Sequence, residues 1–250
     1  MCRMFAVEGS PEFAYSLQEA LISAAMNDNF RKGGGSHDSG WGGVWYSEIN
    51  QRLYRTTTPI FRDSNAIQFF ECDRPLIGLS HARLAAPGEP IRGPFDSHPF
   101  SMQFEEELGY LTHNGQVDKH KLEESAKAYN VSSLNDSEVF TLLLEHAGGH
   151  SMKERLEHVI KVVHETNAMK GALNIMTLSI VRGGGKRIFY HCDFPDEDKE
   201  LYYSLYVLKD GENSAVMSST VAYKAGFIDK DGGLVNPNVT KCPRGKVQVL

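Results

Sequence analysis

Short apolar or alternating runs, separated by turn residues, divide most of this sequence into segments of strand length. Such runs are typical of β-strands, because successive side chains on a strand point to opposite faces of a sheet. The segments with this pattern are residues 2–7, 43–48, 53–57, 76–83, 109–113, 173–181, 187–192, 202–208, 215–219 and 246–250. We therefore expect a protein built mainly on β-sheets.

Helical spacing of apolar residues is confined to fewer segments, most of them in the middle of the chain. Leu17, Leu21 and Ala24, for example, fall on one face of a helix. The helical segments are residues 16–26, 121–130, 137–147 and 152–167. Consecutive helices between two groups of strands argue against regular βαβ alternation and favour two stacked sheets covered by helices.

Composition and glycine placement indicate one domain. The chain has 250 residues, of which 41% are hydrophobic and 23% charged, so it can bury a sizeable core. Glycine-rich clusters at residues 33–35, 183–185 and 231–233 are too short for linkers and predict loops or hairpin turns. We expect a single domain over residues 2–250.

Charge and cysteine spacing exclude several classes of function. The net charge of −6, from 26 basic and 32 acidic residues without a basic block, argues against a nucleic-acid partner. No apolar stretch approaches the roughly 20 residues that span a bilayer, so we expect a cytoplasmic protein without membrane contact. The 4 cysteines lack paired spacing, which indicates neither a disulfide framework nor a zinc site. Cys72, Cys192 and Cys242 are interpreted as packed thiols.

One histidine pair, His146 and His150, has a spacing that would place two imidazoles near each other on a helix. Gly148 and Gly149 lie between them and favour a helix end instead. No cluster of cysteines or carboxylates completes a ligand set, so we expect neither a metal nor a cofactor.

Cys2 directly follows the initiator methionine, and a small second residue generally allows Met1 to be removed. The nucleophilic thiol and an α-amino group of pKa about 8 would then belong to one residue, and the amine could accept the thiol proton. By itself, a cysteine at the second position favours a small apolar residue at the start of an edge strand over a nucleophile. Other segments must decide between these interpretations.

Read together, five segments resemble the class II glutamine amidotransferases, which are N-terminal-nucleophile hydrolases. They are Met-Cys at the start, His-Asp-Ser-Gly-Trp-Gly at 37–42, Ser-His-Ala-Arg-Leu-Ala-Ala-Pro-Gly at 80–88, His-Asn-Gly at 113–115 and Asn-Asp-Ser-Glu at 135–138. The glycines at 33–35 and the His-Pro-Phe at 98–100 make the chain similar to stand-alone members without a synthase domain. The resemblance implies an α+β fold, a four-layer αββα sandwich of two mostly antiparallel sheets covered by helices, in a single glutamine amidotransferase type-2 domain.

The resemblance also assigns roles to particular residues. Cys2 would attack the amide, and Arg83 would grip the α-carboxylate of the substrate with its paired donors. Asn114 and Gly115 would form the oxyanion hole. Asp136 would bind the α-ammonium. Taken singly, Arg83 is a surface arginine, 113–115 a hairpin turn and Asp136 a helix cap.

Further motif residues are expected around these groups. His81, His98 and His113 are expected to lie behind the residues that contact the substrate or to support the fold, and so are Trp41, as a packing residue, and Gly42 beside it. Synthase-coupled members have Trp and His where this chain has Leu84 and Pro87, and many relatives have Asp at Ser39. These departures affect the ordering of the substrate loop and the identity of the substrate.

Three functions remain open at this point. The first is a hydrolase that converts glutamine or a small γ-glutamyl compound to glutamate, through a γ-glutamyl thioester, with release of ammonia or an amine. The second is a glutaminase subunit that delivers ammonia to a separate synthase chain. The sequence offers no nucleotide-binding motif and no second active site, so an ammonia acceptor would belong to another chain. The third is a non-enzymatic binding protein with a vestigial site. A homo-oligomer is compatible with all three.

Overall fold

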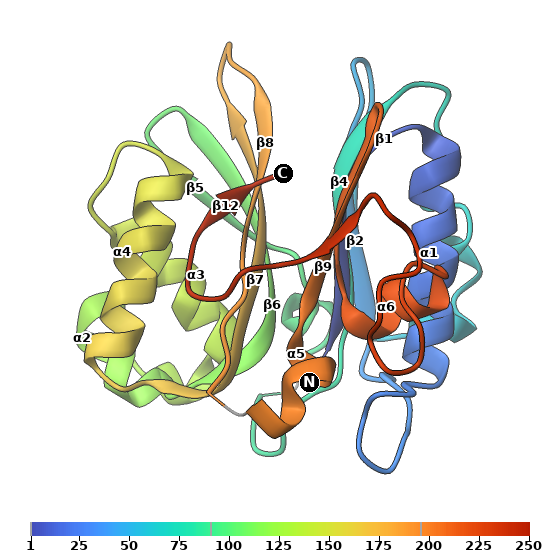
Figure 1. Cartoon of the computed structure of the whole chain (residues 1–250). Coiled ribbons are helices and arrows are strands. Elements are labelled where there is room, and N and C mark those ends of the chain that lie inside the picture. Colours follow the sequence, from blue (N-terminus) through green and yellow to red (C-terminus); the bar gives the residue numbers. More distant parts are fainter. Residues whose placement is uncertain (1, 91, 196) are drawn as a thin grey trace.

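Two β-sheets stacked face to face, with helices on both outer sides, make up the molecule (Figure 1). This is a computed structural model, and it describes residues 2–90, 92–195 and 197–250. The larger sheet has seven strands in the order β11-β9-β10-β1-β4-β2-β3, and the smaller has five in the order β12-β8-β7-β6-β5. The predicted α+β sandwich of mostly antiparallel sheets is therefore confirmed.

The strands agree with most of the predicted segments. Those of the larger sheet are β1 (Arg3–Gly9), β2 (Trp41–Tyr46), β3 (Gln51–Thr56), β4 (Leu76–Ala82), β9 (Leu205–Asp210), β10 (Asn213–Ser218) and β11 (Val239–Lys241). Those of the smaller sheet are β5 (Phe100–Phe104), β6 (Glu107–Val117), β7 (Met169–Val181), β8 (Lys186–His191) and β12 (Gln248–Val249).

The helices form the outer layers. The α-helices are α1 (Pro11–Met26), α2 (Glu123–Ala126), α3 (Asp136–His146), α4 (Met152–Glu165), α5 (Glu200–Tyr203) and α6 (Ser219–Lys224). Helices α1 and α6 lie on the larger sheet, whereas α3 and α4 lie on the smaller sheet (Figure 1). Ser10 caps α1, with Pro11 at its first position, and Ser151 caps α4.

The core has three apolar layers, one in each gap between the four structural layers. On β1, Phe5 and Val7 face α1, whereas Met4 and Ala6 face the smaller sheet. All four side chains are fully buried. The continuous apolar run at the start of the chain thus reflects a central strand that is covered on both faces.

Some local predictions were wrong. The helix expected at 121–130 consists only of a 3-10 turn and the short α2, because Lys127 adopts a left-handed conformation with φ 48° and ends it. The strand expected at 202–208 begins only at Leu205, after α5. The strands β5 and β11 and the helix α6 were not predicted. In β5, apolar and polar residues alternate, and the apolar ones are buried, so this strand had a signal in the sequence.

None of the helices in the described ranges has both the length and the apolar character needed to cross a bilayer. Helix α3 ends at His146, so that His146 and His150 do not share a helix, and His150 pairs with Glu105 at the surface. Cys192 and Cys242 are buried, and their thiols donate to the backbone carbonyls of Tyr203 and Pro243.

Candidate active site

Cys2 lies immediately before β1 and is only 8% exposed. Its backbone nitrogen donates to Oδ1 of Asn114 at 2.8 Å. Its sulfur accepts a hydrogen bond from the backbone N–H of Leu84, with Sγ and N 3.4 Å apart. Both the nitrogen and the sulfur of the predicted nucleophile are thus fixed by residues distant in sequence. Met1, whose removal the sequence predicts, lies outside the described residues.

Asn114 and Gly115 lie near the end of β6, just before an irregularity in its pairing with β7. A Cβ atom on Gly115 would lie 1.8 Å from the carbonyl oxygen of Ala172 on the neighbouring strand and 2.5 Å from Nε2 of His113. Only glycine fits between these two neighbours. Since Oδ1 of Asn114 binds Cys2, the Nδ2 group is the donor half of this amide.

Arg83 follows the last residue of β4 and is 7% exposed. Its backbone N–H donates to the carbonyl of Gly40 at 2.9 Å, and its carbonyl accepts from Ser39 at 3.1 Å. The hydroxyl of Ser39 accepts a further bond from the N–H of Ala85 at 3.1 Å. Ser39, which departs from the pattern of many relatives, therefore helps to hold the loop that follows Arg83.

Asp136 is the first residue of α3, and its neighbours perform the capping. The side chain of Asn135 accepts from the backbone N–H of Glu138, whose carboxylate accepts in return from the N–H of Asn135. The carboxylate of Asp136 accepts from the N–H of Val117 at 3.2 Å. Asp136 therefore does not cap the helix, as it would if taken singly, and its carboxylate points to β6 instead.

A small cavity of about 40 Å³ brings the predicted residues together. Cys2, Arg83, Gly115 and Asp136 all line it. Asn114 reaches the same place through its bond to the nitrogen of Cys2. The lining of this cavity therefore includes the thiol, the guanidinium of Arg83 and three carboxylates. Two of these carboxylates already have cationic partners, because Asp96 pairs with Arg92 and Glu89 with Lys119.

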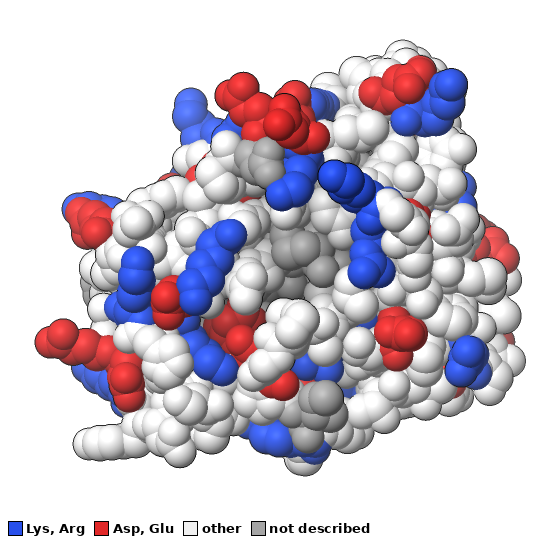
Figure 2. Space-filling view, turned by 90° about the horizontal axis from the view of Figure 1, so that it is seen from below, with Lys and Arg blue, Asp and Glu red and all other residues white. Residues whose placement is uncertain are grey.

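A second, larger cavity of about 960 Å³ adjoins the first. The two share Cys2, Gly115 and the loop residues Leu84, Ala85 and Ala86, so that the thiol lies at their junction. We call them the inner and the outer cavity. Figure 2 shows the molecule from below, at the end where Figure 1 marks the N-terminus, with Lys and Arg side chains around a hollow.

Three buried histidines lie behind the inner cavity. Burial lowers the pKa of His81 to about 3, and burial together with the charge of its neighbours holds the pKa of His98 well below its usual value. Burial also lowers the pKa of His113, whose Nδ1 lies 3.1 Å from the hydroxyl of Ser137. His98 and His113 line the cavity, whereas His81 stacks behind His98 with ring centroids 4.0 Å apart. All three are neutral near pH 7.

Trp41 and Gly42 belong to the structural support of the site. Trp41 is fully buried, packs against the rings of Tyr54 and Phe69, and donates from Nε1 to Asp63 at 2.9 Å. A Cβ atom on Gly42 would lie 2.3 Å from the carbonyl oxygen of His98. Because Gly42 has no side chain, the backbone at His98 can pack closely against β2.

The sequence analysis missed a buried charged cluster directly beneath Cys2. Arg3 pairs with Asp28 at 2.8 Å, with both side chains inaccessible to solvent, and Nε2 of His37 lies 2.8 Å from the same carboxylate. Burial favours the neutral acid, but hydrogen bonds from His37 and Thr220 and the positive charge of Arg3 hold the pKa of Asp28 well below its usual value. Burial lowers the pKa of His37 to about 4. The available signal was Arg3 itself, a charge inside an apolar strand.

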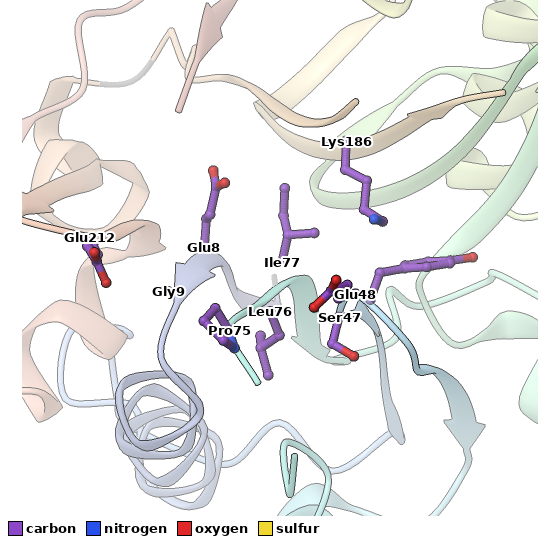
Figure 3. Close-up of a pocket in the computed structure, with 10 residues that line it drawn as sticks. Glu8, Gly9, Ser47, Glu48, Pro75, Leu76, Ile77, Lys186 and Glu212 are labelled. Atoms are coloured by element: carbon purple, nitrogen blue, oxygen red, sulfur yellow. The ribbon is translucent and has the colours of Figure 1, made fainter. Parts of the chain in front are cut away.

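Another cavity, of about 420 Å³, lies at the opposite end of β1, where Glu8, Glu48, Glu212 and Lys186 are among the lining residues (Figure 3). None of the predicted site residues is among the described residues that line it. In the described ranges, no group of three or more His, Cys, Asp or Glu side chains is arranged to hold a metal ion. The thiol and its surroundings are therefore the candidate active site.

The profile of the family described as glutamine amidotransferases class-II matches residues 1–215, and the chain belongs to this family. The fold is similar to the structure of the allosteric regulatory enzyme of purine biosynthesis, with a TM-score of 0.64 and 14% identity over 99% of this chain and 46% of that chain. It is also similar to a glutamine aminotransferase class-II domain protein from Silicibacter pomeroyi, with a TM-score of 0.55 and 17% identity over 98% and 94% of the two chains. No curated protein matches the sequence. This chain spans 46% of the length of the purine biosynthesis enzyme.

Proposed function

We propose that this protein is a stand-alone amidohydrolase in which Cys2 attacks the γ-amide of glutamine or of a small γ-glutamyl compound. The observation that carries this proposal is the shared inner cavity of Cys2, Arg83 and Asp136. A thiol, a cation and a carboxylate in one small cavity match a substrate with a reactive carbonyl at one end and a zwitterion at the other.

The polar end of the substrate is bound by opposite charges. The guanidinium of Arg83 offers two parallel donors to the α-carboxylate, and the carboxylate of Asp136 accepts from the α-ammonium. His98 also lines this cavity, and neither of its ring nitrogens has a hydrogen-bond partner among the described residues. Because His98 is neutral, it can add a hydrogen bond to the substrate without repelling the ammonium group.

The reaction begins when processing of Met1 frees the α-amine of Cys2. This amine takes the thiol proton as Sγ attacks the amide carbon, and it passes the proton to the departing nitrogen when the C–N bond breaks. Nδ2 of Asn114 and the N–H of Gly115 stabilise the tetrahedral oxyanion. Water then cleaves the γ-glutamyl thioester to yield glutamate and the free thiol, with the amine as the proton carrier.

Delivery of the released ammonia to a separate synthase chain is the second candidate. One observation favours it. The purine biosynthesis enzyme contains the fold of this chain in only 46% of its length, so in that protein the fold is one part of a longer chain. A stand-alone hydrolase releases glutamate at a useful rate by itself, whereas a glutaminase subunit stays slow until its synthase partner is added.

The proposed function is tested with purified protein whose mass shows loss of Met1. Cys2→Ala should abolish release of glutamate from glutamine and from γ-glutamyl amides while the circular dichroism spectrum stays native. Cys72→Ala is the matched control, because this thiol is half-buried and does not line the inner or the outer cavity, and it should keep full activity. Unchanged turnover in Cys2→Ala would refute the mechanism.

A further inference from the structure

The outer cavity lies on the side of Cys2 away from the groups that bind the amino-acid end of the substrate. Arg83 and Asp136 line only the inner cavity, whereas Cys2 and Gly115 line both. The inner cavity, at about 40 Å³, must widen to admit a γ-glutamyl group between Arg83 and Asp136. With that group bound and its carbonyl carbon at Sγ, the nitrogen of the scissile amide lies toward the outer cavity.

The outer cavity is much larger than the ammonia that glutamine would release. Ammonia is similar in size to water, which occupies about 30 Å³ in the liquid. The outer cavity measures about 960 Å³, in the upper part of the range of about 300–1,000 Å³ that is typical of small-molecule pockets. Its size therefore suits a substituent on the amide nitrogen.

The walls of the outer cavity combine basic and aromatic groups. Arg31 and Lys32 come from the loop after α1, whereas Lys199, just before α5, and Tyr202, on α5, lie on the other side. Asp198 is the acidic residue among the described lining residues. Although the whole chain has a net charge of −6, the lining of this cavity is positive. Lys and Arg side chains, together with some Asp and Glu side chains, lie around the hollow that Figure 2 shows on this face.

Buried contacts hold the two walls at fixed positions. The carboxylate of Asp28 accepts from the N–H of Phe30, which lines the cavity, and from the hydroxyl of Thr220 at 2.6 Å. Arg3, which pairs with Asp28, also donates to the carbonyl of Tyr202 at 3.3 Å and lies 4.1 Å from the centre of its ring. One buried ion pair therefore supports the loop that carries Arg31 and the helix on the opposite wall.

The side chain of Arg31 has donors left for a ligand. Its Nη1 donates to the carbonyl of Ser36 at 3.4 Å, which uses one of the five N–H groups of a guanidinium. Lys32 is exposed beside it. A carboxylate within the outer cavity would gain charge-assisted hydrogen bonds from these two side chains.

Resting on the proposed function, we propose that the outer cavity binds an amine leaving group that carries a carboxylate, so that the preferred substrate is a γ-glutamyl amide of an amino acid or short peptide. In the acylation step the S–C bond forms and the C–N bond breaks. The thiol proton goes to the leaving nitrogen, and the free amino acid departs through the outer cavity. Water then releases glutamate and restores the thiol.

Three γ-glutamyl probes that differ in the charge of the leaving amine test this inference, with glutamine as the reference substrate. They are γ-glutamylalanine, its neutral carboxamide γ-glutamylalaninamide, and the cationic γ-glutamylputrescine. The wild-type protein should have a kcat/KM for γ-glutamylalanine about tenfold or more above that for the carboxamide, the ratio that corresponds to one charge-assisted hydrogen bond. It should be slowest with γ-glutamylputrescine.

Variants connect this preference to Arg31 and Lys32 on the loop after α1. In Arg31→Gln/Lys32→Gln the ratio between γ-glutamylalanine and its carboxamide should fall toward one. In Arg31→Glu/Lys32→Glu the order should reverse, with γ-glutamylputrescine becoming the best of the three probes. Lys209→Gln is the control, because this exposed lysine on β9 does not line the outer cavity, and it should keep the wild-type ratio.

The possible failures are distinguishable. If the wild-type protein hydrolyses glutamine but shows a ratio near one, the inference about the outer cavity is overturned and the proposed function stands. The same holds if the ratio is high but survives in Arg31→Gln/Lys32→Gln. If neither glutamine nor any of the probes is hydrolysed, the proposed function fails, and this inference fails with it.

Discussion

The backbone nitrogen of Cys2 lies 2.8 Å from Oδ1 of Asn114, a residue 112 positions further along the chain. The two residues belong to different layers, because Cys2 precedes β1 of the larger sheet and Asn114 lies on β6 of the smaller sheet. This contact orients the nitrogen that serves as the base in the proposed mechanism. Because Oδ1 of Asn114 is occupied by this contact, Nδ2 remains as the donor for the oxyanion in the proposed mechanism.

Asn114 is therefore predicted to act in the chemical step. Asn114→Ala should lower kcat about 10²- to 10³-fold with little change in KM, because the lost donor acts on the tetrahedral intermediate. Asn114→Asp keeps an acceptor for the nitrogen of Cys2 but loses the donor, and it should be similarly slow. Steady-state kinetics with glutamine measure both. A variant that only raises KM would remove Asn114 from the oxyanion hole.

Arg83 is predicted to act in binding. Arg83→Lys replaces a two-donor fork with a point charge, so KM for glutamine should rise about 10- to 100-fold, the loss of one to two charge-assisted hydrogen bonds, while kcat changes less. The exposed Arg187→Lys on β8 is the control and should behave as wild type. A drop in kcat alone would contradict the assignment of Arg83 to the α-carboxylate.

The buried pair of Arg3 and Asp28 is predicted to stabilise the fold strongly. Asp28→Asn leaves the guanidinium of Arg3 buried without its counter-charge, which should lower the free energy of unfolding by about 3–5 kcal/mol. Urea denaturation measures this loss. Lys161→Ala removes one partner of an exposed pair with Glu165 and should change stability by less than about 1 kcal/mol. Equal effects of the two substitutions would show that Arg3 is not held as described.

Stability should fall as the pH is lowered from about 7 to about 5. In the unfolded chain a histidine binds a proton below pH about 6.5. In the folded chain the pKa of His81 is about 3 and that of His37 about 4. The unfolded state therefore holds more protons in this window, and each histidine lowers the free energy of unfolding by up to about 1.4 kcal/mol per pH unit.

Urea denaturation across this pH range measures the effect. His81→Asn should flatten the pH dependence, because one buried group that resists protonation is removed. His158→Asn, on the exposed face of α4, is the control and should leave the slope as it is in the wild type. A wild-type protein whose stability is constant from about pH 7 to about 5 would contradict the burial of these imidazoles.

Gly115 is predicted to tolerate no side chain. A Cβ atom there would lie 1.8 Å from the carbonyl oxygen of Ala172, so Gly115→Ala must displace β6 from β7 and move Asn114 with it. We expect loss of activity and a lower melting temperature. Gly148→Ala is the control, since no atom lies within 4 Å of the added Cβ, and it should be neutral. Full activity in Gly115→Ala would contradict the close approach.

Local sequence determined the secondary structure wherever short-range interactions decide it. Leu17 and Leu21 recur at helical spacing and lie buried on one face of α1, as predicted. Asn135 and Glu138 form a capping box within four residues, so the start of α3 was readable. The motif around Arg83 was likewise visible, since its residues are adjacent in the chain.

The tertiary structure alone decided which of these segments meet. Strand pairing within two sheets, and the stacking of the sheets, bring Cys2 to Asn114 and separate an inner from an outer cavity. Arg3 on β1 pairs with Asp28 because the fold places the loop after α1 next to the start of β1. A single sequence carries periodicity and local hydrogen-bonding preferences, but these do not specify contacts between residues far apart in the chain. Such contacts are fixed by the packing of the whole core, and the charge around the leaving group is therefore a property of the fold.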